Sequence, residues 1–156
     1  MPVGPPIVAA VFAWAHFLAV GVGAGLLLAE YWLCRRMPDR QQVRLLGQVD
    51  LGYQLALIGS LATGLALALY AGQDAAWYLA NRLFWLKMGI FVMIAVVAVA
   101  PTLQYIRWNR EARTAPSFAP LTRELERVRS AVAFGLGLWL ILPLIAVLVA
   151  DGYGLK

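Results

Sequence analysis

Four long apolar runs occupy most of this chain of 156 residues, at positions 7–33, 51–71, 83–106 and 131–150. Each run has about 20 residues or more, enough helix to cross a hydrocarbon core of about 30 Å. Only 13% of the residues are charged, whereas a soluble domain carries about 25%. The runs therefore predict an all-α fold, a polytopic membrane protein built on four transmembrane helices.

The connections between the runs are too short for a separate soluble domain, so we expect residues 1–156 to form one four-helix transmembrane domain. Long helices joined by short loops favour an up-down-up-down antiparallel bundle. The N-terminal sequence has neither a positively charged region nor a cleavage site of small residues. We therefore expect the first run to be a retained helix rather than a signal peptide.

Basic residues are divided unevenly between the two sides of this bundle. The first and third connections hold ten arginines, namely Arg35, Arg36, Arg40, Arg44, Arg107, Arg110, Arg113, Arg123, Arg127 and Arg129. The opposite side has only Arg82 and Lys156. Because positive loops stay in the cytoplasm, both termini are predicted to be extracytoplasmic. The formal net charge of +5 then faces anionic lipid headgroups, and no nucleic acid is expected as a partner.

The connections also carry signals for helix ends. In the third connection, Pro116 and Pro120 should end the third helix, and Thr122 should cap an extension of the fourth. In the second connection, Trp77 and Tyr78 suit the membrane interface as anchors.

Small residues recur at a spacing of four in the first two helices, as Gly21 with Gly25 and Ser60 with Gly64. Such pairs let helix backbones approach closely in lipid. They predict close helix contacts inside the bundle, and they are equally able to support a homodimer or a larger membrane complex.

His16 is the only histidine of the chain and lies inside the first apolar run. His16, Gly23 and Glu30 follow one another at intervals of seven residues, so they share one helix face. Gly23 leaves space either for a flat cofactor or for a neighbouring helix. For His16 three roles remain open: a hydrogen bond to a neighbouring helix, a haem ligand, or a contact to a proton relay or quinone.

Lys87 lies near the start of the third run, at a depth similar to that of His16. Charge inside the hydrocarbon is expensive and often functional. Its long stem either snorkels to the outer interface or points inward to an anionic group near His16.

A second polar layer near the cytoplasmic side consists of Glu30, Asp50 and Gln54. Pairing with Arg36 or Arg44 would satisfy the two acids, so we interpret this layer as structural.

Motifs for other chemistries are missing from the sequence. It has no CxxCH, no cluster of cysteine and histidine, no phosphate-binding glycine loop and no nucleophile elbow. The single cysteine, Cys34, excludes an intramolecular disulfide and is expected to be buried or interfacial. Hydrolase chemistry is therefore not expected.

Three segments carry a family resemblance: AWAHFLAVGVGAGLLLAEYWLCRR, LFWLKMGIFVMI and PTLQYIRW. With them the chain resembles a bacterial family of predicted four-helix membrane proteins of unknown function. More distantly, it is similar to HemJ-type protoporphyrinogen oxidases and CopD-like copper-resistance membrane proteins. In HemJ-type proteins a first-helix histidine is associated with haem b and a third-helix lysine is required. The resemblance implies those roles for His16 and Lys87.

The sequence thus leads to a candidate haem b- or porphyrin-binding redox protein of the bacterial inner membrane. Its axial metal ligand would be His16, its cofactor-binding residues His16, Gly23 and Lys87, and its candidate catalytic residue Lys87. The alternative is a non-catalytic accessory or assembly subunit of a larger membrane complex. A transporter comes third, since four helices form only a small path unless the protein dimerises.

Overall fold

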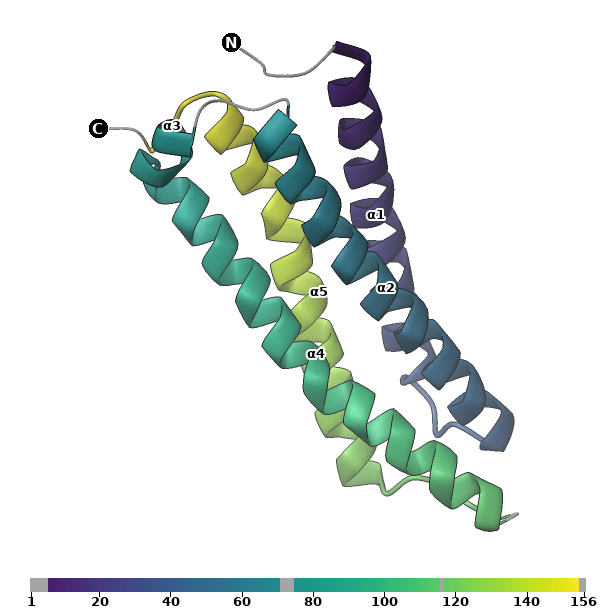
Figure 1. Cartoon of the computed structure of the whole chain (residues 1–156). Coiled ribbons are helices and arrows are strands. Elements are labelled where there is room, and N and C mark those ends of the chain that lie inside the picture. The colour runs from purple at the N-terminus through teal and green to yellow at the C-terminus, as the bar shows by residue number, and fades with distance from the viewer. Residues whose placement is uncertain (1–5, 71–74, 116, 155–156) are drawn as a thin grey trace.

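The computed structural model describes residues 6–70, 75–115 and 117–154, and within these ranges the chain is helical with no strand. The helices are α1 (Pro6–Leu33), α2 (Arg40–Tyr70), α3 (Ala75–Ala80), α4 (Arg82–Thr114) and α5 (Thr122–Ala150) (Figure 1). All except the six-residue α3 are long and apolar enough to cross a membrane. The predicted all-α fold with four membrane helices is therefore confirmed.

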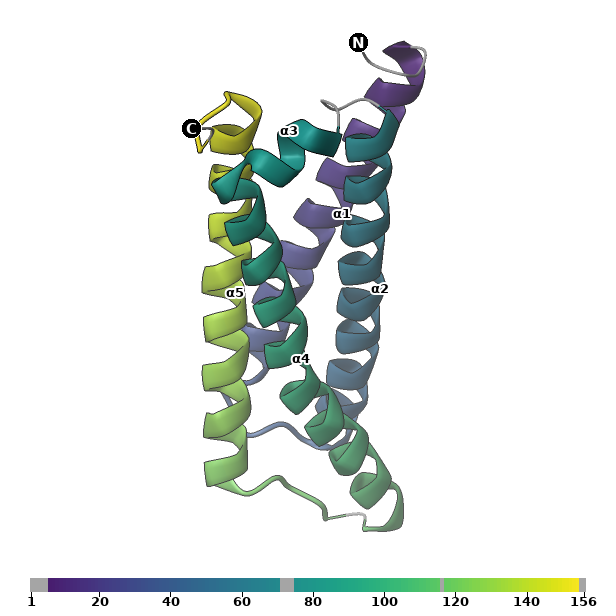
Figure 2. The same cartoon turned by 60° about the vertical axis from the view of Figure 1, so that its left-hand side comes forward.

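The four long helices run alternately in opposite directions, and α1 begins at the same end of the bundle at which α5 ends (Figures 1 and 2). Each packs against two neighbours, in the order α1, α2, α4, α5 and back to α1. The end at which α1 begins, which also carries α3, is the terminal end. The end with the arginine-rich connections is the basic end. Which membrane side each end faces stays a prediction.

The helices extend well past the apolar runs at the basic end. The α2 helix begins at Arg40, although its apolar run begins at residue 51, and α4 continues past its apolar run to Thr114, two residues before Pro116, as predicted. With 31 residues, α2 is about 46 Å long, longer than a hydrocarbon core. Hydropathy marked only the lipid-embedded part. The extension of α2 is instead amphipathic, with Val43 and Leu46 buried on one face.

Several helix ends are fixed by hydrogen bonds to side chains. The Asp39 carboxylate accepts from the Gln42 backbone N–H at 2.8 Å, and the Gln42 side chain accepts from the Asp39 N–H at 3.2 Å. This reciprocal pair is a capping box at the start of α2. The cap predicted at Thr122 is wrong: Leu121 takes that position and no side chain caps α5. The start of α5 is still stabilised, because the negative charge of Glu124 in the first turn complements the positive end of the helix dipole.

Burial divides the bundle into two halves. The basic half comprises residues 23–60 and 94–139, and all four long helices contribute buried residues to it. The terminal half comprises residues 7–22, 61–69, 82–93 and 140–150. There, α1, α2 and α4 contribute no buried residue, and only α5 does so. The closed core therefore lies in the basic half, and the terminal half is more open.

Trp139 marks the boundary between the halves. Its indole N–H donates to the Val20 carbonyl at 2.9 Å, which fixes the ring across α5 and α1. The ring lies against Gly23 and makes an edge contact with Tyr53, at a centroid distance of 5.6 Å. This arrangement closes the core at one level of the bundle.

Candidate functional site

His16 lies half-buried between α1 and α2 in the terminal half. Its Nδ1 is 3.0 Å from the Ser60 carbonyl oxygen and 3.2 Å from the Thr63 hydroxyl oxygen. A carbonyl only accepts, so Nδ1 carries a proton and donates. Within the described chain, Nε2 has no hydrogen-bond partner, which leaves its lone pair free to bind another group.

The surroundings of His16 are shaped by small residues of α2. A Cβ at Gly64 would lie 3.0 Å from Cε1 of the His16 ring, so the absence of a side chain makes room for the imidazole. The Thr63 hydroxyl donates to the Gly59 carbonyl and can therefore accept from Nδ1–H. The predicted close approach of these two helices is thus confirmed at Gly64.

Lys87 is half-buried on α4, also in the terminal half. Its ammonium is near enough to act electrostatically on the His16 imidazole. That the two residues share one site stays a prediction. The described residues offer Lys87 neither a hydrogen bond nor an ion pair. A partly desolvated ammonium without a partner is able to bind an anionic group.

Gly23 is buried at the junction of the halves, where its missing side chain accommodates Trp139. A Cβ there would lie 2.5 Å from Cζ2 of the indole ring. On the opposite side of α1, Gly21 and Gly25 are exposed, and a Cβ at either would meet nothing within 4 Å. The glycine that α1 uses for close packing is therefore Gly23, and the predicted role of Gly21 and Gly25 inside the bundle is wrong.

The second polar layer lies in the closed basic half, where Glu30 is 1% and Asp50 5% exposed. The predicted pairing of these acids with Arg36 or Arg44 is wrong, because the ion pairs of the described residues join Arg107 to Glu111 and Glu124. Arg36 and Arg44 are exposed, whereas the two acids are buried in the core.

Hydrogen-bond donors from α4 take the place of the expected arginines. The Thr102 hydroxyl donates to Asp50 at 2.8 Å and accepts from the Gln54 amide at 2.9 Å. The Tyr105 hydroxyl donates to Glu30 at 3.3 Å. Thr102 and Tyr105 were not predicted as partners of the acids, although their spacing of three places them on one helix face.

Cys34 belongs to the same buried cluster. It is fully buried, as expected, with Sγ 3.6 Å from the Tyr105 hydroxyl oxygen. Thiol, phenol and carboxyl group thus follow one another from the end of α1 toward the centre of the bundle.

Comparison with protein families places the chain among membrane proteins without an assigned activity. The family model described as predicted membrane protein (DUF2214) matches residues 8–154, and the chain belongs to this family. No curated protein and no solved structure matches the chain. The predicted resemblance to an uncharacterised membrane family is confirmed, and the more distant similarity to HemJ-type and CopD-like proteins stays a prediction.

Proposed function

We propose that this member of the DUF2214 family is a redox protein that binds haem b in the terminal half of its bundle. The observation that carries the proposal is the fixed imidazole of His16, with Nδ1 held by the Ser60 carbonyl and Nε2 free. Metal-bound histidines in proteins typically donate their other ring N–H in this way. Haem b, when bound, supplies an iron that cycles between two oxidation states.

The donor set of the chain fits a haem better than a metal ion bound by side chains alone. In the described parts of the chain, no group of three or more His, Cys, Asp and Glu residues is close enough to hold a metal ion. A haem iron receives four nitrogens from the porphyrin and needs only one or two axial ligands from the protein. His16 would be one of these ligands. As the only histidine, it leaves the other position to a different residue type, a second protomer or a substrate.

Lys87 would pair with a carboxylate of the same ligand. It interacts electrostatically with His16, and an ammonium near a bound porphyrin is suited to a propionate or to a substrate carboxyl group. In a catalytic version of this function, Lys87 orients that carboxylate. Gly23 would contribute indirectly, because its contact with Trp139 defines where the open terminal half ends and the closed basic half begins.

The absorption spectrum of protein purified from haem-replete cells tests the proposal. We expect a Soret band in the wild type, its loss in His16→Ala, and its retention in Phe17→Ala. Phe17 is the matched control because it neighbours His16 but is 70% exposed, toward lipid. A wild type without the band, or a band unchanged in His16→Ala, would refute the proposal.

We place the protein in the bacterial inner membrane with both termini outside the cytoplasm. The support is the uneven distribution of basic residues: ten lie in the first and third connections, and two lie on the opposite side of the bundle. Reporters fused after Lys156 test the orientation: a reporter active only outside the cytoplasm should work there. Activity of a cytoplasm-only reporter at that position would reverse the topology.

An accessory or assembly subunit of a membrane complex is the second candidate. It is favoured by Gly21 and Gly25, which leave a notch on the exposed side of α1. Small residues four apart let a helix of another chain approach closely in lipid. Gly21→Leu with Gly25→Leu should then abolish co-purification of a partner or a homodimer, whereas the haem-binding function predicts an unchanged Soret band.

A further inference from the structure

Two buried acids in the basic half form no ion pair with any cationic side chain of the described residues. Glu30 and Asp50 lie close enough for their charges to interact, one on α1 and the other on α2. Transferring an isolated carboxylate into an apolar medium is prohibitively unfavourable unless it is paired. Since no ion pair to either acid exists among the described residues, their charge has to be neutralised in another way, by a bound cation or by a proton.

The hydrogen bonds around the acids leave one oxygen unpartnered. Asp50 Oδ1 accepts from Thr102 and Gln54, and Glu30 Oε2 accepts from Tyr105. Glu30 Oε1, in a side chain that is 1% exposed, has no hydrogen-bond partner. A buried carboxylate oxygen without a donor costs about 1–3 kcal/mol or more, so this atom itself indicates a missing partner.

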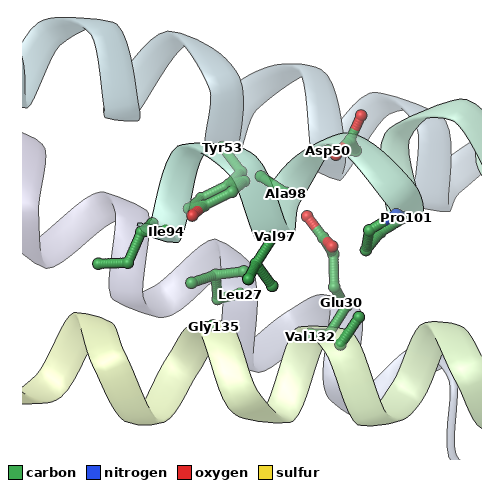
Figure 3. Close-up of a pocket in the computed structure, with 11 residues that line it drawn as sticks. Leu27, Glu30, Asp50, Tyr53, Ile94, Val97, Ala98, Pro101, Val132 and Gly135 are labelled. Carbon is green, nitrogen blue, oxygen red and sulfur yellow. The ribbon is translucent and has the colours of Figure 1, made fainter. Parts of the chain in front are cut away.

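The unpartnered oxygen belongs to a residue that lines a small cavity between the four long helices. Glu30, Asp50 and Tyr53 contribute the polar groups of its wall, and the remainder is apolar. Figure 3 shows the Glu30 carboxyl group pointing across this space toward the helix that carries Asp50 and Tyr53. The cavity volume of about 10 Å³ is at the lower limit for a single water molecule or small ion.

A backbone oxygen is also available at this level. Pro101 has no N–H, so the carbonyl of Val97, one turn earlier in α4, lacks its usual helical donor. Both residues line the cavity. Carboxylate oxygens together with a freed backbone carbonyl are the ligands by which membrane proteins hold small hard cations.

We propose that Glu30 and Asp50 form an internal site for one small monovalent cation, either a sodium ion or a proton. Asp50 already accepts two hydrogen bonds, so a single positive charge is needed at Glu30, whose Oε1 accepts none. In the described chain no group of three or more acidic, cysteine or histidine residues is close enough to hold a transition metal. The site is independent of His16, which lies in the other half of the bundle.

The titratable groups that face Glu30 come from three helices. They are Asp50 and Tyr53 on α2, Tyr105 on α4, and Cys34 at the end of α1. From α5 the cavity receives only apolar residues, and the half-buried Arg129 of the same helix acts electrostatically on Cys34. A response to pH or sodium that depends on Glu30 therefore reports on this cluster.

Thermal unfolding of the full chain in nanodiscs of neutral lipid tests the site. Melting is followed at several pH values in sodium chloride and, at equal ionic strength, in choline chloride. Binding to the folded state alone raises the melting temperature. If the cation is sodium, the wild type melts several degrees higher in sodium chloride. If it is a proton, the melting temperature varies with pH and is the same in both salts.

Glu30→Gln should abolish whichever response the wild type shows, and Asp50→Asn serves as the second variant should Glu30→Gln fail to fold. Glu126→Gln is the matched control, since Glu126 is exposed on α5, and it should keep the wild-type response. The proposal is overturned if the wild type responds to neither sodium nor pH, or if the two site variants respond like the wild type.

Discussion

The two halves of the bundle handle polar groups in different ways. In the basic half, all four long helices bury residues, and Glu30 and Asp50 are enclosed with donors from α4 around them. In the terminal half, His16 and Lys87 are only half-buried, and each presents an atom without a partner in the described chain. An enclosed pair of acids suits an ion, whereas a partly open histidine and lysine suit a larger ligand. Accessibility rather than residue type separates the two candidate sites.

We expect the largest loss of stability from a substitution at the junction between the halves. In Gly23→Val the new side chain would collide with Trp139, which is held by Val20 and Tyr53. Overpacking of this kind should destabilise the bundle by about 3 kcal/mol, measured by unfolding in mixed micelles.

Gly21→Val is the control on the same helix, because its Cβ meets nothing within 4 Å. It should change stability by less than about 1 kcal/mol. If the two variants lost the same amount of stability, the contact between Gly23 and Trp139 would not be what closes the core.

The polar network of the basic half should be the next most sensitive feature. Thr102→Val keeps the shape of the side chain but removes the hydroxyl that donates to Asp50 and accepts from Gln54. We expect a loss of about 1–2 kcal/mol, because a buried acceptor loses a donor. Thr102→Ser retains the hydroxyl and should lose less than half as much. If Thr102→Val is neutral in the same unfolding assay, Asp50 does not depend on this network.

At the terminal end, stability is expected to be more local. Asn81 caps α4 by accepting from the N–H groups of Leu83 and Phe84, and its amide donates to the Tyr153 carbonyl. Asn81→Ala should destabilise this end by about 1 kcal/mol. Hydrogen exchange should accelerate in the first turn of α4 and leave the basic half unchanged, while Asn81→Ser retains part of the cap. Faster exchange throughout the bundle would argue against a separately stabilised terminal end.

The smallest effect is expected at the exposed surface of the basic end. Arg107 forms ion pairs with Glu124 and with Glu111, and its side chain is half exposed. Arg107→Gln should change the free energy of unfolding by less than about 1 kcal/mol, because surface ion pairs contribute little. A larger loss would show that the helix extensions, rather than the closed core, dominate the stability of this half.

The sequence predicted the membrane helices and the depth of the important side chains better than their partners. Length and hydropathy suffice to find the four helices, and the polar residues within them stand out because each is expensive in lipid. The extension of α2 from Arg40 was missed because amphipathic turns outside the bilayer are not apolar runs. The arginine partners expected for Glu30 and Asp50 were wrong for a related reason: charge balance suggests a cation, but only the rotation of α4 places Thr102 and Tyr105 there.

Haem binding by two single variants, compared in one experiment, tests the separation of the two sites most directly. Wild type, His16→Ala and Glu30→Gln are reconstituted in nanodiscs and titrated with haem while the Soret band is recorded. We predict that Glu30→Gln binds haem with the wild-type spectrum and that His16→Ala does not. A Soret band that survives in His16→Ala, or that is lost equally in Glu30→Gln, would contradict it.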